Sequence, residues 1–190
     1  MLKFALMFKI ILQLFIVSVV MAACSGPSVD YEKQAELQYL DTLALRLQDV
    51  KQMLDRVDHE DIMERKEIIE HNYEFLDEKL REKGIVPDAE MMRMIDEYKA
   101  LEKLYERTDA NYNNIVKELE ELVIQVKTLK ASANSKDYNK ETFKIYFKQE
   151  KEDVLKLHNL ALETLKPCIE TESVFMRRQA EVEELATKMK

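Results

Sequence analysis

Three histidines, His59, His71 and His158, are the side chains best suited to metal binding or acid–base catalysis in this sequence. Zinc proteases need a second histidine four residues after the first, and none follows His59 at that spacing. Di-iron bundles need a glutamate three residues before a histidine, and His71 has isoleucine there. Asp55 with His59, and Glu67 with His71, are ordinary pairs on a helix surface. The sequence therefore predicts no catalytic residue, no metal site and no cofactor, and we expect no enzyme.

The two cysteines, Cys24 and Cys168, lie far apart and form no zinc-binding pattern. Cys168 falls on the apolar face of a predicted helix, which favours a buried, structural thiol. A disulfide to another molecule remains the alternative for this residue. The sequence contains 2 glycines, too few for a phosphate-binding loop or a nucleophile elbow.

Residues 1–23 have the order of a signal peptide, with a basic start, an apolar run and small residues at the end. Lys3 and Lys9 supply the positive charge, and the apolar run extends from Ile10 to Val20. A transmembrane helix needs about 20 consecutive apolar residues, and Lys9 interrupts the only window of that length. The segment therefore indicates export.

The end of this segment resembles the lipobox of bacterial lipoproteins, in which an aliphatic residue and two small residues precede a cysteine. Here the four positions are Met21, Ala22, Ala23 and Cys24, with Met21 in place of the family's usual leucine. The resemblance implies cleavage after residue 23, a lipid on the Cys24 thiol, and an acyl chain such as palmitate on the new amino terminus. It implies a cell-envelope protein held at the membrane through Cys24. An uncleaved signal anchor and an ordinary secretory signal remain alternatives, and both place the domain outside the cytoplasm.

Residues 24–29 form a short tether, and residues 30–190 form the predicted domain. If the cell is Gram-negative, the family's sorting habit implies the outer membrane, because Ser25 follows the cysteine. The whole chain contains 2 Gly, 3 Pro and no Trp, and 35% of its residues are charged. Leu, Glu, Lys, Met, Ala and Gln dominate the domain, and these residues favour helices. The composition therefore predicts an all-α fold.

The region between residues 91 and 129 gives the clearest helical pattern. Apolar positions alternate at spacings of three and four residues without a slip, and Thr108 is the one polar member. The positions are Met91, Met94, Tyr98, Leu101, Tyr105, Thr108, Tyr112, Ile115, Leu119, Leu122, Val126 and Leu129. This seam predicts one long helix that packs like a coiled coil.

Two further long helices are predicted, one on each side of this seam. The first covers residues 30–83, and its apolar pattern shifts by one position across Asp58–Asp61, where no Gly or Pro stands. We therefore favour a continuous or kinked helix there over a break. Gly84 is expected to end that helix, and Asp88 to cap the next one.

The third helix covers residues 139–188, and Pro167 is expected to kink or split it. Together the three predicted helices form an elongated, coiled-coil-like, up-down-up three-helix bundle. An opening at Asp58–Asp61 or at Pro167 would instead give a four- or five-helix bundle.

Charge and seam composition favour binding of protein over other functions. After residue 23 the chain carries 27 basic and 37 acidic residues, a net charge of -10, which argues against a nucleic-acid partner. We therefore expect a non-enzymatic scaffold or protein-binding module with an envelope protein as partner, and the heptad pattern also permits self-association. The alternative is a ligand-binding or metal-dependent enzymatic bundle, whose site would use polar seam residues. These are Glu150, Thr164, Thr171 and Arg178 of the third helix, and His71, His158 and Glu150 would have to converge in a metal site.

Overall fold

A computed structural model describes residues 31–189 of the chain, so the signal segment, Cys24 and the tether lie outside the described residues. Four helices account for nearly all of the described part: α2 (Tyr31–Leu54), α3 (His59–Lys83), α4 (Ala89–Ala133) and α5 (Lys140–Lys188). No strand occurs within residues 31–189, which confirms the all-α prediction. None of the described helices combines the length and apolarity that crossing a bilayer requires.

The helix count differs from the three predicted, because the first predicted helix is divided in two. The expectation of a continuous helix through Asp58–Asp61 was wrong, since α2 ends at Leu54 and α3 begins at His59. Asp58 has an extended backbone, and its carboxylate accepts hydrogen bonds from the amides of Glu60 (2.9 Å) and Asp61 (3.3 Å). A side chain that satisfies the free amides of a helix start favours a break even where no Gly or Pro stands.

The connection between α3 and α4 follows the sequence prediction. Gly84 takes the left-handed conformation, φ 62°, that lets its amide and the next one bond back to the last turn of α3. Asp88 then caps α4, and its carboxylate accepts a hydrogen bond of 2.9 Å from the amide of Met91. Both predicted helix-end residues are thereby confirmed.

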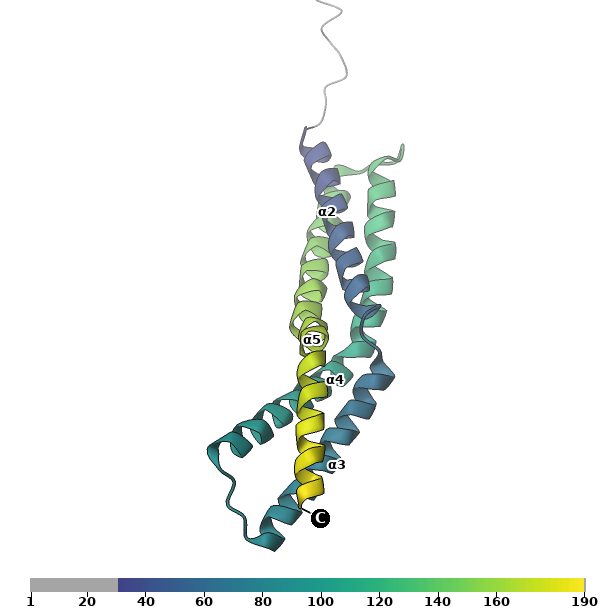
Figure 1. The fold of residues 1–190 in the computed structure, drawn as a ribbon. Helices are drawn as coiled ribbons and strands as arrows, with labels where there is room; N and C mark the ends of the chain where they lie inside the picture. Colours follow the sequence, from purple (N-terminus) through teal and green to yellow (C-terminus); the bar gives the residue numbers. More distant parts are fainter. Residues whose placement is uncertain (1–30, 190) are drawn as a thin grey trace, which may run out of the picture. The chain divides into compact units, whose positions relative to one another are not determined.

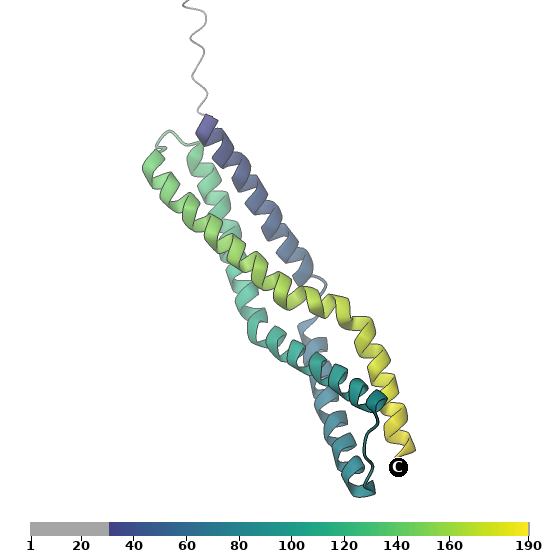
Figure 2. The same cartoon turned by 90° about the vertical axis from the view of Figure 1, so that its left-hand side faces the viewer.

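Helix α5 runs through Pro167 without a break, although Figure 2 shows its ribbon bending in the middle. Proline has no N–H, so the carbonyl of Glu163, four residues earlier, loses its helical partner. The guanidinium of Arg107 on α4 donates to this carbonyl instead. The Thr108 hydroxyl lies 3.3 Å from the carbonyl of Thr164. A donor from α4, Arg107, therefore offsets part of the cost of proline within α5.

The bundle comprises residues 37–189, which belong to one compact unit. In Figures 1 and 2, α4 and α5 run side by side along the bundle, while α2 and α3 follow one another beside them. Three helices therefore lie together at either end, with the α2–α3 break between them. The α4 seam faces the core as predicted, because all of its positions are buried except Met91 and Tyr112, which are half-buried.

Candidate functional site

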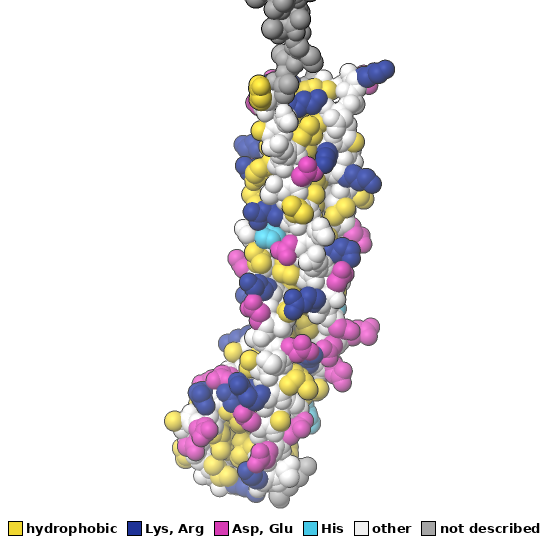
Figure 3. All heavy atoms as spheres, turned by 45° about the horizontal axis from the view of Figure 1, so that its top comes forward, with side chains coloured by type: hydrophobic (Ala, Val, Ile, Leu, Met, Phe, Trp, Pro, Cys, Tyr) yellow, Lys and Arg dark blue, Asp and Glu magenta, His cyan; other side chains and the backbone are white. Residues whose placement is uncertain are grey.

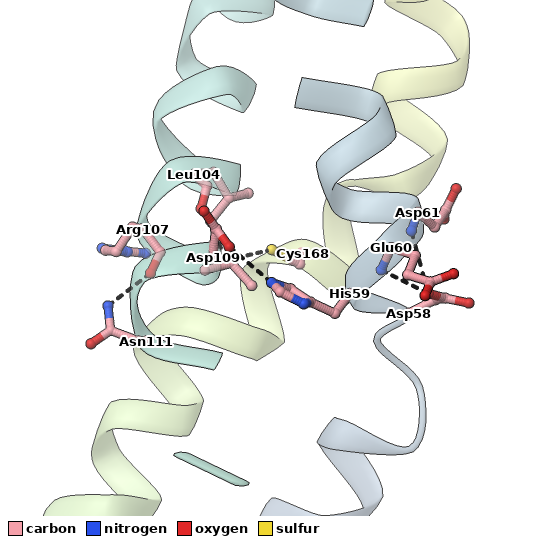
Figure 4. Close-up of polar contacts among 10 residues, drawn as sticks. Asp58, His59, Glu60, Asp61, Leu104, Arg107, Asp109, Asn111 and Cys168 are labelled. Atoms are coloured by element: carbon pink, nitrogen blue, oxygen red, sulfur yellow. Dashed lines mark hydrogen bonds and ion pairs between the residues drawn. The ribbon is translucent and has the colours of Figure 1, made fainter. Parts of the chain in front are cut away.

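His59 pairs with a carboxylate on another helix and not with Asp55. Its Nε2 lies 2.9 Å from Oδ1 of Asp109 on α4, and its ring stacks on Tyr112 with centroids 4.5 Å apart. Figure 4 shows His59 reaching from the start of α3 toward Asp109. The contact joins the N-terminal end of α3 to α4, so the imidazole has a structural role.

His158 is buried between two side chains of α2. Its Nδ1 lies 3.3 Å from the guanidinium of Arg46, and its Nε2 lies 2.9 Å from Asp49. Arginine can only donate, so Nδ1 accepts, and the ring carries its proton on Nε2 to donate to Asp49. Both ring nitrogens are thus occupied in joining α2 to α5.

The structure does not bring the histidines together into a metal site. His71 is exposed on α3, His158 faces α2, and neither belongs to a cluster of potential ligands within residues 31–189. Glu150 lies elsewhere on α5, so the convergence of His71, His158 and Glu150 required by the enzyme alternative does not occur.

Three glutamates form the one group in the described part of the chain whose geometry could hold a cation. Glu70 of α3 and Glu102 and Glu106 of α4 place carboxylate oxygens within 4.8 Å of one another. Sequence reasoning missed this group because its members come from two helices. Lys66 lies 3.7 Å from Glu70 and already offsets part of the charge. Groups of exposed carboxylates such as this are common on acidic helical proteins without a bound ion.

Cys168 belongs to a buried polar cluster in the middle of the bundle. Its Sγ lies 2.9 Å from the hydroxyl of Thr108, which also donates to the carbonyl of Leu104 at 2.9 Å (Figure 4). Burial raises the pKa of the Cys168 thiol, and the Thr108 contact opposes the rise only in part. The prediction of a buried thiol is confirmed, and a raised pKa makes the thiol a poor nucleophile.

A polar cavity of about 260 Å³ lies against this cluster, below the α2–α3 break. Arg65, Tyr105 and Cys168 line it together with acidic side chains. The Arg65 guanidinium pairs with Asp61 and lies 3.3 Å from Glu172, so its charge is already matched. Burial raises the pKa of the Tyr105 phenol, which keeps that group neutral. Apart from Arg56 at its edge, the cavity therefore offers mainly paired charges and neutral groups, an arrangement suited to holding three helices together.

A larger and more apolar pocket lies at one end of the bundle, between the last turns of α4 and the first turns of α5. We call it the turn pocket. Its volume is about 480 Å³, within the range of small-molecule sites. Its lining residues are Ile124, Gln125, Thr128, Leu129, Ser132, Ser135, Asp137, Tyr138, Asn139, Thr142, Phe143, Tyr146, Gln149 and Glu150.

Glu150 is the one lining residue of the turn pocket whose buried carboxylate has an oxygen without a hydrogen-bond partner. The side chain is nearly buried, with 7% of the residue exposed. Burial raises the pKa of Glu150, and the nearby carboxylate of Asp153 raises it further. The sequence placed Glu150 on the α5 seam, but the pocket beside it depends on the turn, which periodicity does not describe.

Four large apolar side chains are exposed on the parts of α4 and α5 that form the turn pocket, and Ile124 and Tyr146 among them also line it. Ile124 is 66% exposed, Ile145 68% and Tyr146 52%, and Val123 is also exposed. We call these four residues the apolar rim. Elsewhere, charges of both signs are interspersed over the face seen in Figure 3. That face therefore has no broad basic patch that could bind nucleic acid, which agrees with the net negative charge.

No family model, curated protein or solved structure matches this chain.

Proposed function

We propose that this chain is a lipid-anchored envelope protein, at the outer membrane if the cell is Gram-negative, whose helical bundle binds another protein and catalyses no reaction. The lipobox resemblance at Cys24 supports the anchor. The histidines support the absence of catalysis, because His59 and His158 are each engaged by a carboxylate between helices. The raised pKa of the Cys168 thiol supports it as well.

The apolar rim is the observation that carries the protein-binding function. Ile124, Ile145 and Tyr146 each expose more than half of their surface, although apolar positions are plentiful in the core of this bundle. Interfaces combine apolar contact area with neighbouring polar groups, and the turn pocket adjoins this rim. A partner that covers the rim would remove these side chains from water, which is the main favourable term in association.

The position of the apolar rim in the bundle also suits a partner at the membrane. Tyr39 packs edge-on against Phe147 with ring centroids 5.8 Å apart, and Asp41 pairs with Lys130. The beginning of the bundle therefore lies beside the end that carries the rim. Because Leu37 follows Cys24 by only 13 residues, chain connectivity keeps this end within reach of the lipid. We therefore expect the partner to be a protein at the same membrane.

The experiment compares partners recovered with the lipidated protein from its own envelope after chemical crosslinking. The variant Ile124→Asp/Ile145→Asp places charges in the rim without touching the core. Met176→Asp is the matched control, since Met176 is 61% exposed on α5 but lies outside the rim. We expect the rim variant to lose one specific partner that the wild type and the control retain. Equal recovery with all three proteins would contradict the proposal.

A further inference from the structure

Glu150 is a buried acidic side chain, and no cationic side chain within residues 31–189 lowers its pKa. One of its carboxylate oxygens is inaccessible to solvent and accepts no hydrogen bond. Burial raises the pKa of Glu150, and the negative charge of Asp153 raises it further. Both effects disfavour the charged form. Buried carboxylates in proteins are normally paired, because an uncompensated charge in an apolar environment is costly. A cation bound from outside the bundle would supply the counter-charge that the described residues do not provide.

The turn pocket supplies the space for such a counter-charge with an apolar body attached. Leu129, Phe143 and Tyr146 provide apolar and aromatic surface, and Asp137 from the turn adds a second negative charge. Hydroxyl and amide side chains complete the lining. No Lys or Arg lines the pocket, so the only charged groups that an anionic ligand would meet there are the carboxylates of Asp137 and Glu150. An apolar pocket with a few convergent polar groups is typical of a small-molecule site.

We propose that the turn pocket binds a small organic ammonium ion with an apolar or aromatic body. The ammonium group donates hydrogen bonds to Glu150, and the body packs against Phe143 and Leu129. Charge-assisted hydrogen bonds in a water-poor site are stronger than neutral ones, which gives the pocket its preference for a cation. This small-molecule site shares Ile124 and Tyr146 with the apolar rim, but it binds a different class of ligand from the proposed protein partner.

The test uses 4-fluorophenethylamine as the probe and full-length protein purified in a non-ionic detergent. Fluorine NMR of the probe measures its affinity, with 4-fluorophenethyl alcohol as the uncharged analogue of the same shape. We expect the amine to bind at least about tenfold more tightly than the alcohol. Glu150→Gln should weaken amine binding by about tenfold or more, and bring it to the level of the alcohol. Glu152→Gln, an exposed neighbour outside the pocket, should leave it unchanged.

A second variant keeps the test decisive if Glu150→Gln alters folding. Thr128 is exposed and lines the pocket, so Thr128→Trp fills the space without disturbing the core, and circular dichroism verifies its helicity. Loss of amine binding in Thr128→Trp supports the site. The inference is overturned by a wild type that binds amine and alcohol equally or not at all, or by binding that survives both variants. The crosslinking experiment on the rim is scored separately, so failure of one proposal does not decide the other.

Discussion

Polar side chains on the apolar seams are the residues of most interest in this molecule. Of the polar residues on the predicted seams, Thr108, Glu150, Thr164 and Arg178 are buried, whereas Thr171 is half-buried. Thr108 and Arg178 have partners, since Thr108 bonds within the cluster at Cys168 and Arg178 pairs with Glu97. Periodicity therefore identified four of the buried polar residues of the described chain but did not identify His158. It did not identify their partners, because these lie about 60 to 80 residues away in sequence.

Replacement of Glu150 should stabilise the fold at neutral pH. The pKa of Glu150 is raised above its ordinary 4.5, so the unfolded chain ionises first and the folded state loses stability as pH rises above about 4.5. Glu150→Gln removes this loss. We expect a gain of about 1 kcal/mol in the free energy of unfolding at pH 7, and a much smaller difference near pH 4.

Urea unfolding at the two pH values measures this effect, with the exposed Glu152→Gln as control. A Glu150→Gln variant that is less stable than the wild type at pH 7 would mean that the carboxylate has a stabilising partner.

Tyr98 should make the protein sensitive to alkali. Its hydroxyl donates to Gln179 and accepts a hydrogen bond of 3.2 Å from Asn72, and burial raises its pKa from 10.0 to about 12. The stability that this group contributes is complete below pH 10 and is lost as pH rises through 12. Between about pH 9 and pH 12 we expect the wild type to lose about 2 kcal/mol more than Tyr98→Phe.

Denaturant unfolding of both proteins across this pH range tests the expectation. The comparison isolates Tyr98, because all other tyrosines titrate in both proteins. Parallel losses in the wild type and Tyr98→Phe would show that Tyr98 ionises as readily in the folded state as in the unfolded chain.

Helix ends show what the sequence could and could not predict at the scale of elements. Gly84 and Asp88 were identified because their conformational roles are local. The break before α3 was missed because no Gly or Pro marks it. The Asp58 carboxylate instead accepts hydrogen bonds from backbone amides, and these bonds compete with a continuous helix. At Pro167 the sequence predicted a kink or a split, and α5 stays one helix that bends; the Arg107 donor on α4 that compensates the proline could not be found from local sequence.

A double-mutant cycle should detect this compensation at Pro167. Arg107→Ala should destabilise the wild type by about 1 kcal/mol, because the carbonyl of Glu163 then loses its donor. In a Pro167→Ala background the restored backbone amide bonds that carbonyl, so Arg107→Ala should cost markedly less. The thermal or urea unfolding of the four proteins gives the coupling energy. A coupling near zero would show that Arg107 does not substitute for the missing amide.

The whole molecule combines a proposed lipid anchor with a helical bundle, and the chain after residue 23 is net acidic. Helical content was predictable from composition, and the α4 seam from periodicity. The turn pocket and the apolar rim were not predictable, since they depend on how the ends of α4 and α5 separate at their turn. The role of Cys24 stays a prediction, because it lies outside the described residues.

The anchor is tested by replacing Cys24. We expect the wild type to incorporate a labelled fatty-acid analogue and to fractionate with membranes, because the thiol carries the lipid. Cys24→Ala should take up no label, whereas Cys168→Ala, which changes a buried core thiol, should be labelled normally. A Cys24→Ala protein that is still labelled and still bound to membranes would contradict the lipobox assignment.

Site-specific photo-crosslinking in the native envelope tests the central claim, docking of a protein on the apolar rim, most directly. A photoreactive amino acid replaces Ile145 in one strain and Met176 in another, two positions of similar exposure on the same helix. Docking on the rim predicts one discrete crosslinked protein from position 145, absent at position 176 and lost when Ile124→Asp is added. Equal crosslinking from both positions, or no protein adduct from position 145, would contradict a protein-binding function for this surface.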